Sequence, residues 1–338
     1  MASILYNNTT VITLVWVCGI IGTIGNISVI IKIFKVGKRS SKIMSKLIRK
    51  YPTGRVKNSS RSSIFLKLIF NLAISDLIGC IYLLIIAGAD IHYRFLNLGD
   101  YSSNVSSTFN YTLIYATWMH SPPCYIARFF NFFSVGATTC LTVLIAVDRF
   151  ISVFTSNSMT LRLRTKRLQI LIYSSWACGI CSAVIGTVFA YITLNLKDQF
   201  TNYFYHNLCT LDNIENEYIR IFLTGLVLAG VGAYGAAACC YIAIAYKIRC
   251  SKNTSKLPKS SRIDQRIAKK ILIITATVVF SNLAAWIPSL AISLLATLRF
   301  YLLYTNGAFK IAMIVASLSI QINCSINPLV FLLSMRKS

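Results

Sequence analysis

The chain has 338 residues, of which 56% are hydrophobic and only 13% are charged. A soluble domain carries about 25% charged residues, so this composition excludes an ordinary soluble protein. The net charge of +25 comes from basic residues that cluster in short stretches between long apolar runs. This distribution is typical of a membrane protein with basic cytosolic loops, and it argues against a nucleic-acid-binding protein, which needs a soluble basic face.

Seven apolar runs can each cross a bilayer, because a membrane-spanning helix needs roughly 20 residues. They predict an all-α fold, a seven-transmembrane-helix bundle formed by one domain, residues 11–334. A short N-terminal segment, 1–10, precedes it and a short tail, 335–338, follows. We expect no cleavable signal peptide, because the first run is too long for one. The predicted spans are Val11–Phe34, Ile64–Ala87, Tyr125–Val147, Leu168–Leu194, Tyr218–Tyr246, Ile267–Leu295 and Ala308–Leu333.

The loops between the predicted spans alternate in charge. Basic residues gather in segments 35–63, 162–167 and 247–266. Because basic loops are retained in the cytosol, this alternation predicts an extracellular N-terminus and a cytosolic C-terminus. The first basic loop is either a solvated segment that sets the orientation or a docking segment for anionic membrane lipids. The acids of the opposite side are Asp90, Asp100, Asp198, Asp212, Glu215 and Glu217.

Two further features bear on the outer side. Sequons on that side predict glycosylation, although Asn58 and Asn253 form sequons on the inner side, so this support for the topology is weak. Cys124 and Cys209 both face an oxidising compartment, which predicts a disulfide that ties the loop between spans four and five over the mouth of the bundle. The outer sequons begin at Asn7, Asn8, Asn104 and Asn110.

A carboxyl group lies in the middle of the second span, at Asp76. Because an ionisable group inside a membrane is costly, it is usually functional. Without a basic partner at its depth, it either takes up a proton or binds a small cation such as Na⁺. The alternative is a hydrogen-bonded polar core that only packs the helices. The other polar residues at compatible depth are Asn26, Thr138, Asn323 and Asn327.

The inner end of span three carries Asp148 and Arg149, which can form an ion pair. Proline removes a backbone hydrogen bond and kinks a helix. Pro288 follows Trp286 by two residues in span six, and Pro328 lies in span seven. We expect kinks at both prolines, with the tryptophan beside the first of them.

These residues, in this order, resemble the signature motifs of the rhodopsin-like (class A) G-protein-coupled receptors over essentially the whole chain. Some positions depart from the family pattern. Phe331 replaces a tyrosine, which removes a hydroxyl contact to Tyr241, and Gly230, Gly232 and Gly235 stand in place of the span-five proline. The matching motifs are Gly25–Asn26, Asn71–Asp76, Cys124 with Cys209, Asp148–Phe150, Trp176, Trp286–Pro288 and Asn327–Phe331.

Within that family, several segments look like the branch of relaxin and glycoprotein-hormone receptors. They include Ala89–Arg94, Arg266–Lys270 and Ile322–Pro328. Members of that branch carry a leucine-rich ectodomain, whereas about ten residues precede the first span here.

The resemblance implies a plasma-membrane, multi-pass receptor that binds an extracellular ligand, with a peptide or hormone-like ligand favoured. It would activate a heterotrimeric G protein by helix rearrangement. Asn131 stands where amine receptors have an aspartate and Gln321 where opsins have a lysine, which argues against a monoamine ligand or retinal. The ligand pocket implied by the family consists of Asn131, Phe132, Val135, Trp286 and Gln321. The implied coupling residues are Asp148, Arg149, Tyr241, Asp264, Trp286, Pro288, Pro328 and Phe331.

Two other functions remain as alternatives. A seven-helix transporter or channel would carry several intramembrane charges along a path, and a non-signalling receptor-like scaffold would tolerate Phe331. No Ser/His/Asp or Cys/His set converges at one depth, so we expect no enzyme activity and no cofactor besides an allosteric Na⁺. The three histidines lie outside the spans and could only sense extracellular protons.

Overall fold

The computed structural model describes residues 5, 8–50, 59–99, 117–154, 160–195, 208–210, 217–251, 259–298 and 307–336. Seven long helices account for nearly all of these residues. They are α1 (Thr9–Lys50), α2 (Ser59–Gly99), α4 (Pro122–Phe154), α5 (Thr160–Asn195), α6 (Glu217–Ser251), α7 (Lys259–Thr297) and α8 (Gly307–Arg336).

The seven predicted spans are confirmed, because each long helix contains a stretch long and apolar enough to cross a membrane. The helices are longer than the predicted spans. The second span was expected to end at Ala87, for example, but α2 continues to Gly99. Hydropathy falls where a helix leaves the apolar layer, whereas its backbone hydrogen bonds continue within the same segment. Composition therefore marks the membrane boundary better than the helix ends.

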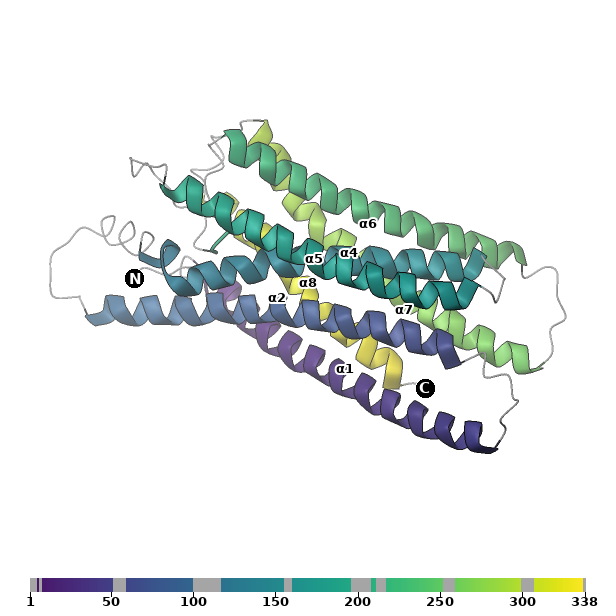
Figure 1. The fold of residues 1–338 in the computed structure, drawn as a ribbon. Coiled ribbons are helices and arrows are strands. Elements are labelled where there is room, and N and C mark those ends of the chain that lie inside the picture. Colours follow the sequence, from purple (N-terminus) through teal and green to yellow (C-terminus); the bar gives the residue numbers. More distant parts are fainter. Residues whose placement is uncertain are drawn as a thin grey trace.

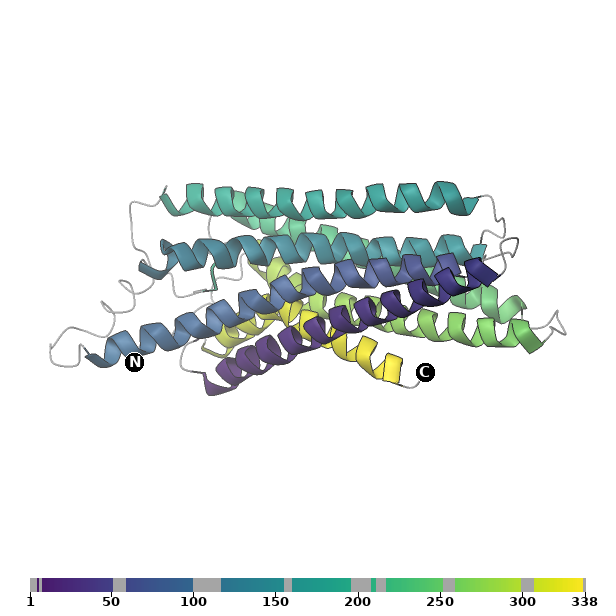
Figure 2. The same ribbon diagram turned by 60° about the horizontal axis from the view of Figure 1, so that its bottom comes forward.

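The helices lie side by side in one bundle, and the two chain ends point to opposite ends of it (Figures 1 and 2). Helix α4 is central, because it contacts α2, α5, α6, α7 and α8. Helix α1 packs against α2 and α8, which brings the first and last spans together. Polar side chains on α4 are consequently within reach of most of the bundle.

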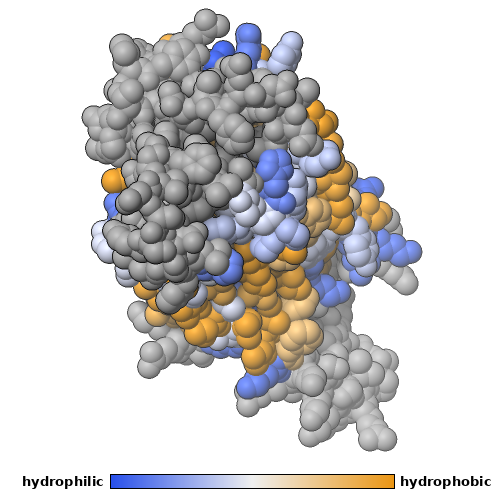
Figure 3. Space-filling model, turned by 90° about the vertical axis from the view of Figure 1, so that its left-hand side faces the viewer, coloured by the Kyte–Doolittle hydropathy of each residue, from blue (hydrophilic) through white to orange (hydrophobic). Residues whose placement is uncertain are grey.

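Large apolar side chains cover the flanks of the bundle. Ile170 and Tyr173 on α5 and Ile221 on α6 are among the most exposed of them. The view onto the end that bears the N-terminus shows orange apolar residues along the sides (Figure 3). Such a surface is stable against lipid chains, because no hydrophobic effect favours burying apolar side chains in an apolar solvent.

Two charged residues lie where the sequence did not place them. Asp90 was expected in an outer loop, but it is fully buried within α2. Arg128 of α4, which the sequence analysis did not single out, is also fully buried. Because α2 continues for about three turns beyond Ala87, Asp90 faces the interior instead of solvent. The expectation of a loop at this position was wrong.

A glycine takes up the space beside the tryptophan of α7. A Cβ atom at Gly230 of α6 would lie much closer to the Trp286 ring than van der Waals contact allows. Trp286 itself is buried and lies 6.2 Å from the Tyr234 ring, centroid to centroid. Gly230, one of the glycines found in place of the span-five proline, therefore allows α6 and Trp286 to pack closely.

We expect Gly230→Ala to destabilise the protein by about 1–3 kcal/mol, because overpacking forces a buried side chain out of its rotamer. The measurement is the melting temperature of the detergent-solubilised protein. Gly232→Ala is the matched control, since nothing lies within 4 Å of a Cβ at this exposed position. An equal melting temperature for the two variants would contradict this packing.

Candidate functional site

Asp76 joins three helices in the middle of the bundle. Its side chain is buried on α2, where the residue is 1% exposed. The Thr138 hydroxyl of α4 donates to Asp76 Oδ1 over 2.9 Å, and Asn327 Nδ2 of α8 donates to Oδ2 over 2.8 Å. Ser75 shares a further hydrogen bond of 2.8 Å with Thr138. Both carboxylate oxygens thus accept hydrogen bonds from neutral groups.

Oxygen atoms beside this cluster are available to a cation. The amide oxygens of Asn323 and Asn327 are buried and have no hydrogen-bond partner among the described residues. A carboxylate with amide and hydroxyl oxygens is the donor set that a hard cation prefers. The residues present therefore fit Na⁺, whereas a polar core without a cation leaves these two amide oxygens unpaired among the described residues.

The other two members of the predicted cation site bond elsewhere. Asn26 Nδ2 donates to the carbonyl oxygens of Gly22 and Cys324, at 2.9 and 3.1 Å. Asn323 Nδ2 donates to Asn282 Oδ1 of α7. Asp76, Thr138 and Asn327 are thus directly bonded, whereas Asn26 and Asn323 lie in adjacent contacts. Asn282 was not predicted from the sequence, although an amide inside an apolar span is a signal for such a position.

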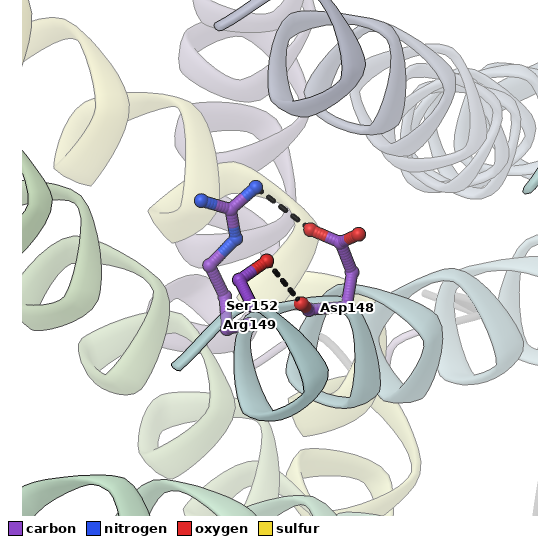
Figure 4. A network of polar contacts seen from close by, with 3 residues as sticks. All are labelled: Asp148, Arg149 and Ser152. Carbon is purple, nitrogen blue, oxygen red and sulfur yellow. Dashed lines mark hydrogen bonds and ion pairs between the residues drawn. The ribbon is translucent and has the colours of Figure 1, made fainter. Parts of the chain in front are cut away.

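Asp148 and Arg149 form the expected ion pair near the end of α4, with Arg149 Nη2 2.8 Å from Asp148 Oδ2 (Figure 4). The Arg149 side chain is 16% exposed. Its guanidinium also lies over the Phe65 ring of α2, 4.8 Å from the centroid. The Ser152 hydroxyl donates to the Asp148 carbonyl oxygen over 2.6 Å. The arginine is therefore held back against its own helix and α2.

The remaining coupling residues fall in separate places. Tyr241 of α6 is buried beside Ala146 and Ala237, whereas Phe331 of α8 belongs to another apolar cluster, with Leu72 and Leu141. Pro288 lies inside α7 and Pro328 inside α8, as predicted. Asp264 belongs to α7, but its side chain lies outside the described part of the chain.

The five residues predicted to line the ligand pocket make different contacts, and their role in ligand binding stays a prediction. Gln321 Nε2 of α8 donates to Asn131 Oδ1 of α4 over 2.6 Å, and Ser134 Oγ donates to Gln321 Oε1 over 3.1 Å. Both amides are thereby occupied with each other and with α4. Phe132 instead packs toward Gly186 of α5, while Val135 packs with Trp286. Residues at matching depth point to different neighbours, because each successive position on a helix turns by about 100°.

The structure contains the predicted disulfide between Cys124 and Cys209, whose Cα atoms are 5.4 Å apart. Beside it, the Tyr82 hydroxyl of α2 donates to the Leu208 carbonyl oxygen over 2.8 Å. These two contacts fasten residues 208 and 209 to α4 and α2 at the end of the bundle that bears the N-terminus.

The predicted glycosylation sites are largely outside the described residues, as Asn7, Asn104 and Asn110 all are. Asn8 is described, and its Oδ1 accepts a hydrogen bond from the Val11 amide over 3.1 Å. This contact caps the first turn of α1. Glycosylation of all four asparagines stays a prediction.

Comparison with known proteins agrees with this arrangement. Residues 55–331 match the family model of the 7 transmembrane receptor (rhodopsin family). The follicle-stimulating hormone receptor of Cairina moschata is 24% identical over 264 residues, 78% of this chain, and human relaxin receptor 1 is 22% identical over 283 residues, 82% of this chain. The chain spans 33% of the length of each of these relatives. Seven membrane-spanning helices, the ordered motifs and the family match together show that the chain belongs to the rhodopsin family of seven-transmembrane receptors.

Proposed function

We propose that this multi-pass plasma-membrane receptor binds an extracellular peptide or hormone-like ligand and activates a heterotrimeric G protein. The family match supports a receptor and not an enzyme. The relatives' names, a follicle-stimulating hormone receptor and a relaxin receptor, favour a hormone-like ligand. The observation that carries the proposal is the Arg149–Asp148 ion pair at the end of the bundle opposite the N-terminus. Its arginine is bound within the receptor and could be released to a partner.

The proposed mechanism is a shift between two arrangements of the helices. The basic loops favour an orientation with the Arg149 end in the cytosol and the disulfide end outside. A ligand at the outer end would favour rotation of α7 about Pro288, which moves the inner half of α7 outward. Arg149 would then leave Asp148 and contact the α-subunit of the G protein and Tyr241.

We further propose that Na⁺ at Asp76 stabilises the resting arrangement. Asp76, Thr138 and Asn327 would hold the ion, with the Asn323 amide oxygen close by. Among the described residues, no basic side chain is bonded to Asp76. Bound Na⁺ would supply the missing positive charge, and its loss would let α2, α4 and α8 move apart. The buried, unpartnered amide oxygens of Asn323 and Asn327 support this assignment.

The test is nucleotide exchange on a panel of G-protein α-subunits, measured in membranes that contain the full chain. We expect exchange above that of receptor-free membranes with at least one subunit. Because coupling between two sites is reciprocal, the same subunit should tighten the binding of any agonist found in a ligand screen. Exchange at background with every subunit and ligand would support the non-signalling scaffold instead, and ion currents or solute uptake would support a channel or transporter.

Gln321→Leu should raise ligand-independent exchange about five- to tenfold, because hydrogen bonds worth about 1 kcal/mol each are lost between α4 and α8. The loss loosens the resting packing of these helices. Gln169→Leu is the matched control, since Gln169 is exposed on α5. Exchange is compared at equal surface expression. A basal rate equal to that of the wild type would show that the Asn131–Gln321 contact does not hold the resting state.

A further inference from the structure

The outer end of the bundle contains a buried carboxylate with an unusual partner. Asp90 of α2 is fully buried, and its Oδ1 accepts a hydrogen bond of 3.1 Å from the main-chain amide of Leu5. The two residues are 85 positions apart in the sequence. Asp90 makes further contacts, and the Leu5 amide is one of the donors that offset the cost of burying its charge.

The Leu5 side chain is itself fully buried, in the same apolar cluster as Tyr82, Trp118 and Leu208. Few side chains in the described part of the chain are as large and as completely buried as this leucine. Its carbonyl oxygen accepts a hydrogen bond of 3.1 Å from the Asn8 amide, which turns the chain into α1. Leu5 thus combines a buried side chain with a donated amide, as a bound peptide residue does.

The residues that surround the Leu5 side chain form walls that are held in position by contacts that do not involve Leu5. Residue 208 is fixed by the Tyr82 hydroxyl, and residue 209 by the disulfide. Tyr93 and Trp118 meet edge to face, with ring centroids 5.7 Å apart. Because these contacts do not involve Leu5, the walls can persist when Leu5 leaves.

We infer that the Asp90 carboxylate and these walls form a binding subsite for an apolar peptide residue, which the chain's own Leu5 fills in the ligand-free receptor. The subsite takes a leucine-sized side chain together with a main-chain N–H donor. An incoming peptide ligand displaces Leu5 and takes over its hydrogen bond to Asp90. The signalling consequence rests on the proposed function, whereas the occupancy of the subsite does not.

The occupancy is tested by hydrogen exchange of the wild-type, full-length receptor, resolved to single amides. The Leu5 amide should exchange at least about tenfold more slowly than the Thr10 amide, which lies in the first helical turn and has no intrahelical acceptor. Asp90→Ala should abolish this protection. Equal exchange of the two amides in the wild type would overturn the inference.

The ligand class is tested with a fluorescent synthetic peptide of residues 1–8 as the probe. The probe should bind Leu5→Ala at least about tenfold more tightly than the wild type, because a tethered segment competes at an effective concentration in the millimolar range. Binding should fall again in Leu5→Ala/Asp90→Ala. The same peptide with alanine at its fifth position is the matched control and should bind weakly. Equal binding of the two peptides, or of the probe to all three receptors, would overturn the subsite.

The outcome also separates the two proposals. If the peptide binds as expected while exchange on every G protein stays at background, the subsite is upheld and the proposed signalling is refuted. If exchange occurs but neither protection nor peptide binding is found, the subsite is refuted and the proposed signalling is upheld.

Discussion

Replacing Arg149 with alanine should abolish receptor-driven nucleotide exchange, with a loss on the order of 100-fold, because a buried charge pair across an interface contributes about 2–5 kcal/mol. In the resting structure the guanidinium is bound to Asp148 and lies over Phe65. Both contacts hold the guanidinium against α4 and α2 and leave the side chain 16% exposed. Alanine removes the group that would reach the G protein and leaves the rest of α4 unchanged.

The measurement is exchange on the responsive α-subunit at matched surface expression, with Arg249→Ala as the control. Arg249 is an exposed arginine in the last turn of α6, near the same end of the bundle. The Arg249→Ala variant loses the same positive charge but keeps the Arg149–Asp148 ion pair. If exchange by Arg149→Ala equals that of the wild type, the receptor mechanism proposed above is wrong.

Replacing Asp76 with asparagine should eliminate the response of the receptor to Na⁺. In the wild type, exchanging KCl for NaCl should stabilise the folded protein by about 2–3 kcal/mol when Na⁺ is near 100 times its dissociation constant. The asparagine keeps the size of the side chain but replaces one acceptor oxygen with an NH2 group and carries no charge, so the attraction for a cation is lost. The melting temperature in each salt, at equal ionic strength, measures the effect without any ligand.

Asp148→Asn serves as the comparison, because it removes a carboxylate from the same bundle at a position outside the Asp76 cluster. Its difference in melting temperature between the two salts should match that of the wild type. A sodium effect that persists in Asp76→Asn, or that is absent from the wild type, would leave the hydrogen-bonded polar core as the function of these residues.

Much of the fold was predictable from the order of residues in the chain. The lengths of the apolar runs predicted seven spans, because a bilayer has a nearly constant thickness. The depth of five polar residues in their spans predicted one cluster, and three of them, Asp76, Thr138 and Asn327, are directly bonded. Cys124 and Cys209 were predicted to pair because both lie at the same membrane surface. Each of these inferences depends only on depth, which follows from counting residues along a helix.

The rotation of each helix about its own axis and the identity of its neighbours were decided by the tertiary structure. Depth did not predict that the side-chain amides of Asn131 and Gln321 hydrogen-bond to each other. Depth also gave no indication that Trp286 needs Gly230 beside it. Asp90 was expected in an outer loop, whereas α2 continues past it and the Leu5 amide donates to its carboxylate. The physical reason is that hydropathy measures transfer into the membrane, while side-chain partners depend on contacts between helices that are far apart in the sequence.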